Sequence, residues 1–90
     1  MTIEETLAER GKTHGDFDSN SAVAQQLKNI MRSGPMWHAM TFAQREAVDM
    51  ICHKLARAVS GNPSFADHWH DIIGYAKLVE DRCNAHPSQT

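Results

Sequence analysis

The chain has no long hydrophobic run, no cluster of basic residues and no apolar signal segment near its start. Its apolar stretches are far shorter than the roughly 20 residues that a membrane-spanning helix needs, so none is predicted. Without a basic run, the phosphate backbone of DNA or RNA is not the expected partner. The N-terminal segment is charged from Glu4 onward, which excludes a secretion signal and predicts a cytoplasmic protein.

Cysteine is scarce, and the common sequence motifs for metal and phosphate are missing. Cys52 and Cys83 are the only two cysteines, and in a reducing cytoplasm we expect them to be unpaired, with Cys52 as a small core residue. Neither C-x-x-C nor H-x-x-x-H occurs, so no zinc site is predicted. The P-loop spacing and a Ser–His–Asp arrangement are absent too, so nucleophilic catalysis is not predicted.

What remains is the composition of an ordinary small domain. The chain has 90 residues, 41% of them hydrophobic, and a net charge of −2. We predict a single domain over residues 1–90, with an ordered core at about 2–83 and a polar tail at 84–90. Because so short a chain has a modest core, we also expect a homo-oligomer.

The pattern of caps and apolar spacing predicts four helices and no strand. The first begins at Thr2, which forms a capping box with Glu5, and stops at Gly11. A polar loop, 11–17, follows. The other three helices are predicted at about 19–33, 41–60 and 64–83. The fold class is therefore all-α, a four-helix bundle-like domain with a C-terminal antiparallel helical hairpin.

The last two predicted helices are amphipathic. On the third, one arc carries Val48, Ile51, Leu55, Ala58 and Val59, and the opposite arc carries Glu46, Asp49, His53 and Arg57. On the fourth, one arc carries Phe65, Trp69, Ile72, Ile73, Ala76, Val79 and Cys83, and Asp67, Asp71, Leu78 and Arg82 lie opposite. Trp69 is in the middle of its apolar arc, so we expect it to be packed in the core.

Two acid pairs on consecutive helices form a candidate metal site. Glu46 and Asp49 lie three residues apart, and Asp67 and Asp71 four apart, so each pair shares a helix face. Four carboxylates suit Mg²⁺, which prefers oxygen ligands and is often shared with phosphates. The alternative is that these acids form two solvated polar faces. They converge only if the apolar arcs of the two helices do not pack against each other.

Basic and aromatic residues near these acids are candidates for contacts with a nucleotide. Lys54 and Arg57 flank the acids of the third helix and suit phosphate, and Lys12 lies in the first loop between Gly11 and Gly15. The full candidate set is Lys12, His14, His53, Lys54, Arg57, His68 and Tyr75. The alternatives are ordinary surface charge and a plain interhelical turn. Trp37 either stacks on a base or is buried in a partner subunit.

Several segments resemble a family of small phage and prophage proteins of unassigned function. They are 9–17, 44–50, 54–57 and 70–81. The second half is also similar to the MazG-like all-α nucleoside triphosphate pyrophosphohydrolases, in which E-x-x-E on one helix and E-x-x-D on the next bind Mg²⁺. Asp71 and Tyr75 match the Asp and Tyr of that pattern, Asp67 falls on its first Glu, and His68 replaces the second Glu.

This resemblance implies a Mg²⁺-dependent nucleotide pyrophosphohydrolase. Glu46, Asp49 and Asp71 would be catalytic, and together with Asp67 they would hold the metal. Because His68 stands at an acid position, a second hypothesis is that the protein sequesters a nucleotide without turnover, for example a host immune signal bound by a phage counter-defence protein. A third is that it is a protein-binding inhibitor of a host system.

Overall fold

The computed structural model describes residues 1–85, which form four α-helices and one short 3-10 helix. They are α1 (Ile3–His14), α2 (Phe17–Arg32), η1 (Trp37–Ala39), α3 (Phe42–Ser60) and α4 (Ala66–Ala85). No strand occurs in this part of the chain, so the predicted all-α class is confirmed. Within the same residues, no helix combines the length and the apolar character that crossing a membrane requires.

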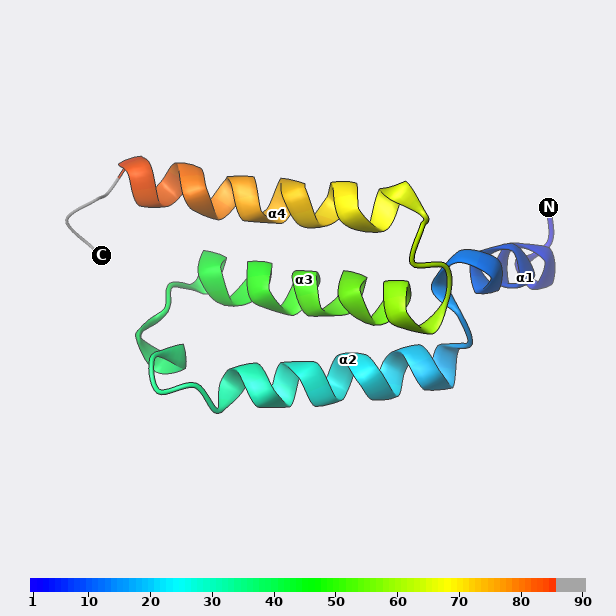
Figure 1. Cartoon of the computed structure of the whole chain (residues 1–90), viewed down its shortest axis with the longest axis horizontal. Coiled ribbons are helices and arrows are strands. Elements are labelled where there is room, and N and C mark those ends of the chain that lie inside the picture. The colour runs from blue at the N-terminus through cyan, green and yellow to red at the C-terminus, as the bar shows by residue number, and fades with distance from the viewer. Residues whose placement is uncertain (86–90) are drawn as a thin grey trace.

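The three long helices lie side by side in one layer, with α3 in the middle (Figure 1). Both α2 and α4 pack extensively against α3. Helix α1 projects from the end of the layer at which α2 begins and α3 ends, and it also contacts α3. Because α2 and α4 cover two opposite sides of α3, the other two sides of α3 form the two faces of the layer.

Two helix starts, those of α1 and α3, follow the predicted caps. Thr2 accepts a hydrogen bond from the Glu5 N–H at 3.1 Å. Thr41 and Gln44 form the predicted capping box, with bonds of 3.1 and 2.9 Å. Such caps satisfy N–H groups that have no partner inside the helix.

The predicted end of the first helix at Gly11 is wrong. Helix α1 continues through Gly11 to His14 and ends at Gly15, which has φ +80°. A helix tolerates an interior glycine at a cost of only about 0.5–1 kcal/mol, whereas a positive φ strongly favours glycine. The predicted loop at 11–17 is therefore mostly helical. Helix α2 also begins before the predicted Ser19, because Asp16 caps it by accepting from the Asp18 and Ser19 N–H groups.

The last predicted boundary also shifts. Helix α4 continues to Ala85, so Asn84 and Ala85 of the predicted polar tail are helical. The remainder of that tail, 86–90, lies outside the described residues.

The buried side chains of the described residues are mostly small. The buried apolar residues are Ala24, Trp37, Ala47, Cys52, Ala56 and Ala58. Cys52 is in the core as predicted, but the prediction that Trp69 is packed there is wrong, because 45% of Trp69 is exposed. Instead α4 turns His68 inward, which is only 2% exposed. The larger apolar residues of the predicted arcs are half-buried or exposed.

Candidate functional site

The end of α1 is held against α3 and α4 by polar contacts around one turn. The Thr13 carbonyl accepts the Asn62 N–H at 2.9 Å and the Nε2–H of buried His68 at 2.8 Å. The His14 carbonyl accepts Nδ2–H of Asn20, a buried residue of α2, at 3.3 Å. These bonds satisfy carbonyls at the helix end, and they fix the His14 ring between the other helices.

A cleft lies between α1, α3 and α4, and we call it the α1–α4 cleft. Its volume is about 400 Å³. It is lined by Glu9, Arg10, Thr13, His14, Lys54, Arg57, Phe65, Asp67, His68 and Asp71. The rings of His14 and His68 lie 5.3 Å apart, and Phe65 meets His68 edge-on at 5.1 Å. This cleft therefore combines a small aromatic wall with several charges.

A second cleft, the α1–α2 cleft, lies between α1, α2 and α3 and has a volume of about 650 Å³. It is lined by Leu7, Arg10, Gly11, His14, Gly15, Asp16, Phe17, Asn20, Ser21, Ala24, Gln25, Lys28, His53 and Arg57. Three residues, Arg10, His14 and Arg57, line both clefts. The two clefts therefore share one basic wall.

Arg57 is the unusual residue of that wall. Its side-chain Nε is buried and has no hydrogen-bond partner among the described residues. Burial lowers the pKa of the Arg57 guanidinium, the positive charge of Arg10 lowers it further, and Asp71 acts in the opposite direction. A buried donor without a partner is destabilising. An anion placed beside Arg57 would supply the missing hydrogen-bond acceptor and would offset the repulsion from Arg10.

Two histidines near Arg57 have lowered pKa values. Burial lowers the pKa of His14, and the charges of Arg57, His68, Lys54 and Arg10 lower it further. Burial also lowers the pKa of His53, followed by the charges of Arg57 and Lys28. Basic groups therefore surround both rings, and each ring gains a proton more easily when an anion is present.

We expect opposite pH effects on the free and the anion-bound protein. Because the pKa values of His14 and His53 are lower in the folded than in the unfolded chain, their contribution to stability is full above about pH 6.5 and is lost as the pH falls through the folded values. A bound anion raises these pKa values, so anion binding strengthens as the pH falls. Sulfate suits this test because its charge stays constant over the range.

The measurement is the melting temperature between about pH 8 and about pH 5.5, with and without sulfate. The gain from sulfate should grow toward low pH, and His53→Gln should reduce that growth. His38→Gln is the control, since His38 is exposed on η1 and lines neither cleft. A gain from sulfate that is the same at every pH would contradict the role of the two histidines.

The four predicted metal-binding acids do not converge. Asp49 pairs with Arg32 of α2 at 3.3 Å, and Asp71 pairs with Lys54 at 3.0 Å. Asp67 lines the α1–α4 cleft, and Glu46 is exposed on α3. Among residues 1–85, no group of three or more His, Cys, Asp or Glu side chains is placed to hold a metal ion. Within one chain, two of the acids thus lie in ion pairs with basic residues, and the Mg²⁺ site stays a prediction.

The pairing of α3 with α4 explains this separation. The Lys54–Asp71 contact sets which residues of the two helices lie at the same level. Glu46 is eight residues before Lys54, so it lies about 12 Å further along α3 at 1.5 Å per residue. Lys54 also supplies the bond that, with its charge, lowers the pKa of Asp71. The Asp71 carboxylate is therefore paired with the Lys54 ammonium group and not with another carboxylate.

The structure brings five of the seven candidate nucleotide contacts together. His14, His53, Lys54, Arg57 and His68 all line the two clefts. Lys12 lies elsewhere and pairs with Glu9 at 3.3 Å on the surface of α1. Tyr75 lines a separate depression on α4 with His70, Asp71, Gly74 and Leu78.

Trp37 is enclosed within the chain. The guanidinium groups of Arg32 and Arg45 each lie 5.8 Å from its ring centre, and the indole is 9% exposed. It therefore offers no free face for stacking on a base.

Sequence reasoning missed two basic residues of the clefts, Arg10 and Lys28. Arg10 and His14 lie four residues apart, so they share one face of α1. That relation is visible only if the helix continues past Gly11. Lys28 follows the apolar stripe of α2 and faces His53 and Arg57 across the α1–α2 cleft. Its position depends on how α2 packs on α3, which no local pattern shows.

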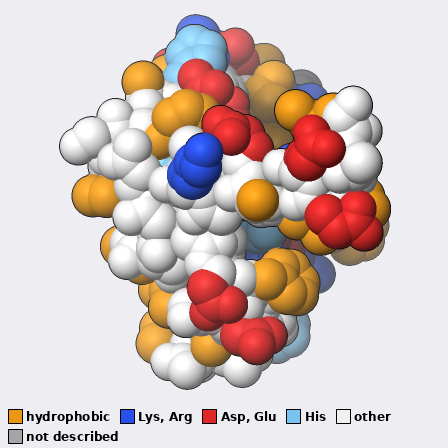
Figure 2. Space-filling model, turned by 90° about the vertical axis from the view of Figure 1, so that its right-hand side faces the viewer, with side chains coloured by type: hydrophobic (Ala, Val, Ile, Leu, Met, Phe, Trp, Pro, Cys, Tyr) orange, Lys and Arg blue, Asp and Glu red, His pale blue; other side chains and the backbone are white. Residues whose placement is uncertain are grey.

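The outer surface near the clefts differs in charge from their walls. Figure 2 shows the end of the molecule from which α1 projects, where acidic side chains are prominent and basic ones are sparse. The first turns of α1 and α2 carry Glu4, Glu5 and Asp18. An acidic outer surface disfavours an extended nucleic acid and leaves the shared basic wall as the place for a small anion.

Fold and site together define a small all-helical protein with two adjoining clefts that share a basic wall. The chain belongs to the family described as a domain of unknown function, DUF6378, whose model matches residues 2–83. Comparison with curated proteins and with solved structures finds no significant match to either.

Proposed function

We propose that the protein binds a phosphate-bearing small molecule of the nucleotide class in the α1–α4 and α1–α2 clefts. The observation that carries the proposal is Arg57, whose buried Nε lacks a partner beside the second guanidinium of Arg10. Guanidinium groups bind phosphate through paired, charge-assisted hydrogen bonds. The cleft volumes of about 400 and 650 Å³ fall in the range of small-molecule sites.

Three helices supply the basic residues and histidines of the proposed site. Arg10 and His14 come from α1, Lys28 from α2, and His53, Lys54 and Arg57 from α3. Phe65 adds an aromatic ring in the α1–α4 cleft, which suits the base of a nucleotide. The phosphates would lie against the shared basic wall, where Arg10 and Arg57 are already close.

Sequestration without turnover is the form of this function that the geometry supports best. The acids that the hydrolase hypothesis needs are separated along the helices, and Asp71 is occupied by Lys54. Hydrolysis is the second candidate, since Asp67 and Asp71 do line the same cleft as Arg57. Either form suits a phage-encoded counter-defence protein. We also propose that the protein is cytoplasmic and that it self-associates.

A nucleotide panel with and without Mg²⁺ tests the proposal by melting temperature and calorimetry. Arg10→Gln removes an exposed basic group of the shared wall and should weaken binding by about 10-fold or more, the value of one charge-assisted hydrogen bond. Arg82→Gln is the matched control, because that exposed guanidinium lies on α4 and donates to the Leu78 carbonyl at 2.9 Å. It should bind as the natural protein does.

The state of the bound nucleotide then separates the candidates. Intact nucleotide released by heating supports sequestration, whereas cleaved nucleotide with free pyrophosphate replaces it with hydrolysis. If no nucleotide changes the melting temperature, the binding proposal is wrong and the protein-binding hypothesis takes its place.

A further inference from the structure

One side of the helix layer is apolar, and no other helix of residues 1–85 packs on it. Residues two apart on a helix lie about 200° apart around its axis. The cleft residues Lys28, His53, Arg57 and Asp71 are each followed, two positions later, by Ile30, Leu55, Val59 and Ile73. These four apolar residues therefore lie on the side of the layer opposite the clefts.

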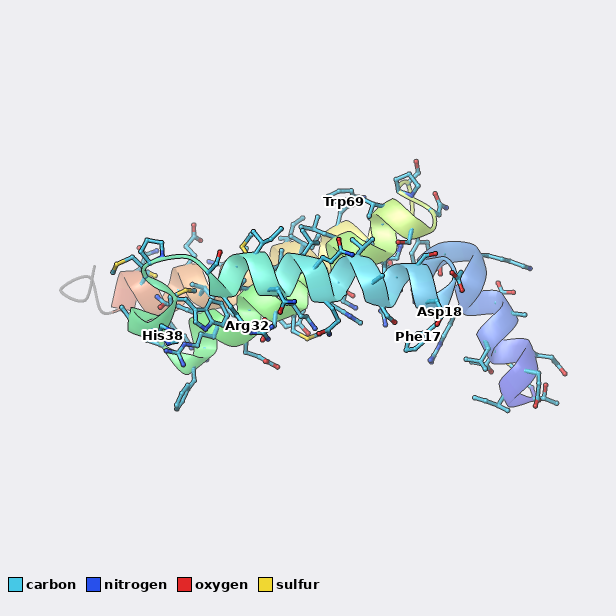
Figure 3. All side chains as sticks on the ribbon, turned by 90° about the horizontal axis from the view of Figure 1, so that it is seen from below. Phe17, Asp18, Arg32, His38 and Trp69 are labelled. Carbon is cyan, nitrogen blue, oxygen red and sulfur yellow. The ribbon has the colours of Figure 1, made fainter. Side chains whose placement is uncertain are left out.

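We call this side the open face. It comprises Ile30 of α2, Val48, Ile51, Leu55 and Val59 of α3, and Trp69, Ile73 and Ala76 of α4. Ile73 is 64% exposed and Val59 71% exposed. Figure 3 shows the layer edge-on, with Trp69 on one side and α1 leaving toward the other.

A groove between α3 and α4 marks the place on the open face where another chain fits. It has a volume of about 490 Å³ and is lined by Met40, Gln44, Ala47, Val48, Ile51, Ala76, Val79 and Glu80. Most of these side chains are apolar, and the small Ala47 and Ala76 allow close approach. A groove of this kind accepts apolar side chains such as those that protrude from the same face.

The chain exposes more surface than a folded monomer of its size. Its accessible surface is 6412 Å², whereas the usual relation for 10.1 kDa gives about 5,300 Å². That total covers the whole chain, and part of the excess of about 1,100 Å² belongs to the projecting α1, none of whose residues is buried. A standard interface takes roughly 800 Å² from each partner. The radius of gyration is 15.2 Å, against about 12 Å for a compact chain of this length.

The composition of the core also indicates that cover is missing. No Leu, Ile, Val, Met or Phe in the described residues is buried, and four of the six buried apolar residues are alanines. Packing that leaves the large side chains uncovered contributes little stability on its own. The missing cover is therefore needed for the fold itself.

We infer that the open face is the interface between two copies of this chain, packed layer against layer. A second copy fits better than a foreign protein, because cover that is needed for folding must be present wherever the chain is made. The face also matches itself, with protruding Trp69 and Ile73 beside a groove that can receive such side chains. This inference rests on the proposed self-association and leaves the clefts free on the outer sides of the pair.

Sedimentation of the full chain with two α4 variants tests this interface. We expect the natural protein to have twice the 10.1 kDa mass of one chain. Ile73→Glu places a charge in the interface and should weaken association by about 100-fold or more. Leu78→Glu is the matched control, since Leu78 is also an exposed apolar residue of α4, at 52%, but lies in the depression with Asp71 and Tyr75. It should leave the mass unchanged.

The outcomes separate the interface from self-association and from ligand binding. A monomeric natural protein would overturn both the interface and the self-association. A dimer that Ile73→Glu and Leu78→Glu affect equally would overturn this interface alone. If Ile73→Glu does not fold, the natural protein decides: its melting temperature must rise with concentration, and a constant value overturns the inference. Sulfate binding, measured separately on the natural protein, tests the clefts independently.

Discussion

Replacing Gly15 by alanine should destabilise the protein by about 3 kcal/mol or more. Gly15 has φ +80° and ψ −176°, a conformation that is essentially restricted to glycine. A Cβ at this position would also overlap the carbonyl oxygen of Ser60, because the turn after α1 crosses the turn after α3 here. Neither backbone segment can move without breaking the bonds that Thr13 accepts from Asn62 and His68. Denaturant unfolding of Gly15→Ala would measure the loss.

Gly11→Ala is the control and should act in the opposite direction. Gly11 lies inside α1, and an added Cβ would meet no atom within 4 Å apart from the neighbouring backbone of its own helix. Alanine in a helix interior is more stable than glycine by roughly 0.5–1 kcal/mol. If Gly15→Ala were as well tolerated as Gly11→Ala, the crossing of the two turns, and with it the position of His14 in both clefts, would be wrong.

Replacing Arg57 by methionine should stabilise the free protein and abolish anion binding. Methionine keeps the long apolar part of the side chain but removes the buried Nε that has no partner and the charge that repels Arg10. Loss of an unsatisfied buried donor is worth roughly 1–3 kcal/mol. In a domain of this size each 1 kcal/mol corresponds to about 4–8 °C in melting temperature. The stabilisation by sulfate or nucleotide should disappear in the same variant.

Arg45→Met provides a matched control on the same helix. Arg45 donates to the carbonyls of Trp37 and His38 at 3.1 and 2.9 Å and stacks on the Trp37 ring. Its replacement should therefore lower the melting temperature while anion binding persists. If Arg57→Met destabilised the free protein as Arg45→Met does, Arg57 would be a structural residue, and the main support for the anion site would be lost.

The four helices and the starts of α1 and α3 could be predicted because they depend on local chemistry. Thr2 and Thr41 cap their helices through residues three positions away, and this spacing is visible in any sequence. The end of α1 was missed for a related reason. Gly11 and Gly15 look equally able to stop a helix, but only Gly15 lies where the chain crosses the turn at Gly61. The contact that distinguishes them joins residues far apart in the sequence.

The sequence indicated which basic residues are candidates for a site, but not which other residues lie next to them. His53, Lys54 and Arg57 were identified from their positions on one predicted helix, and they do line the clefts. The grouping of acids as a metal site followed from a three-residue spacing on one helix and a four-residue spacing on the next. Spacing does not define how far one helix slides along the other. The Lys54–Asp71 contact sets that slide and keeps Glu46 away from Asp71.

The sequence by itself determined which side of each helix is apolar and which is charged, because residues two positions apart always lie on nearly opposite sides of a helix. Only the tertiary structure decided what those sides face. With α2 and α4 packed on either side of α3 (Figure 1), the charged arcs line the two clefts with α1, and the apolar arcs share one face of the layer (Figure 3). The physical reason is that α3 packs through its small residues, Ala47, Cys52, Ala56 and Ala58, instead of its large ones.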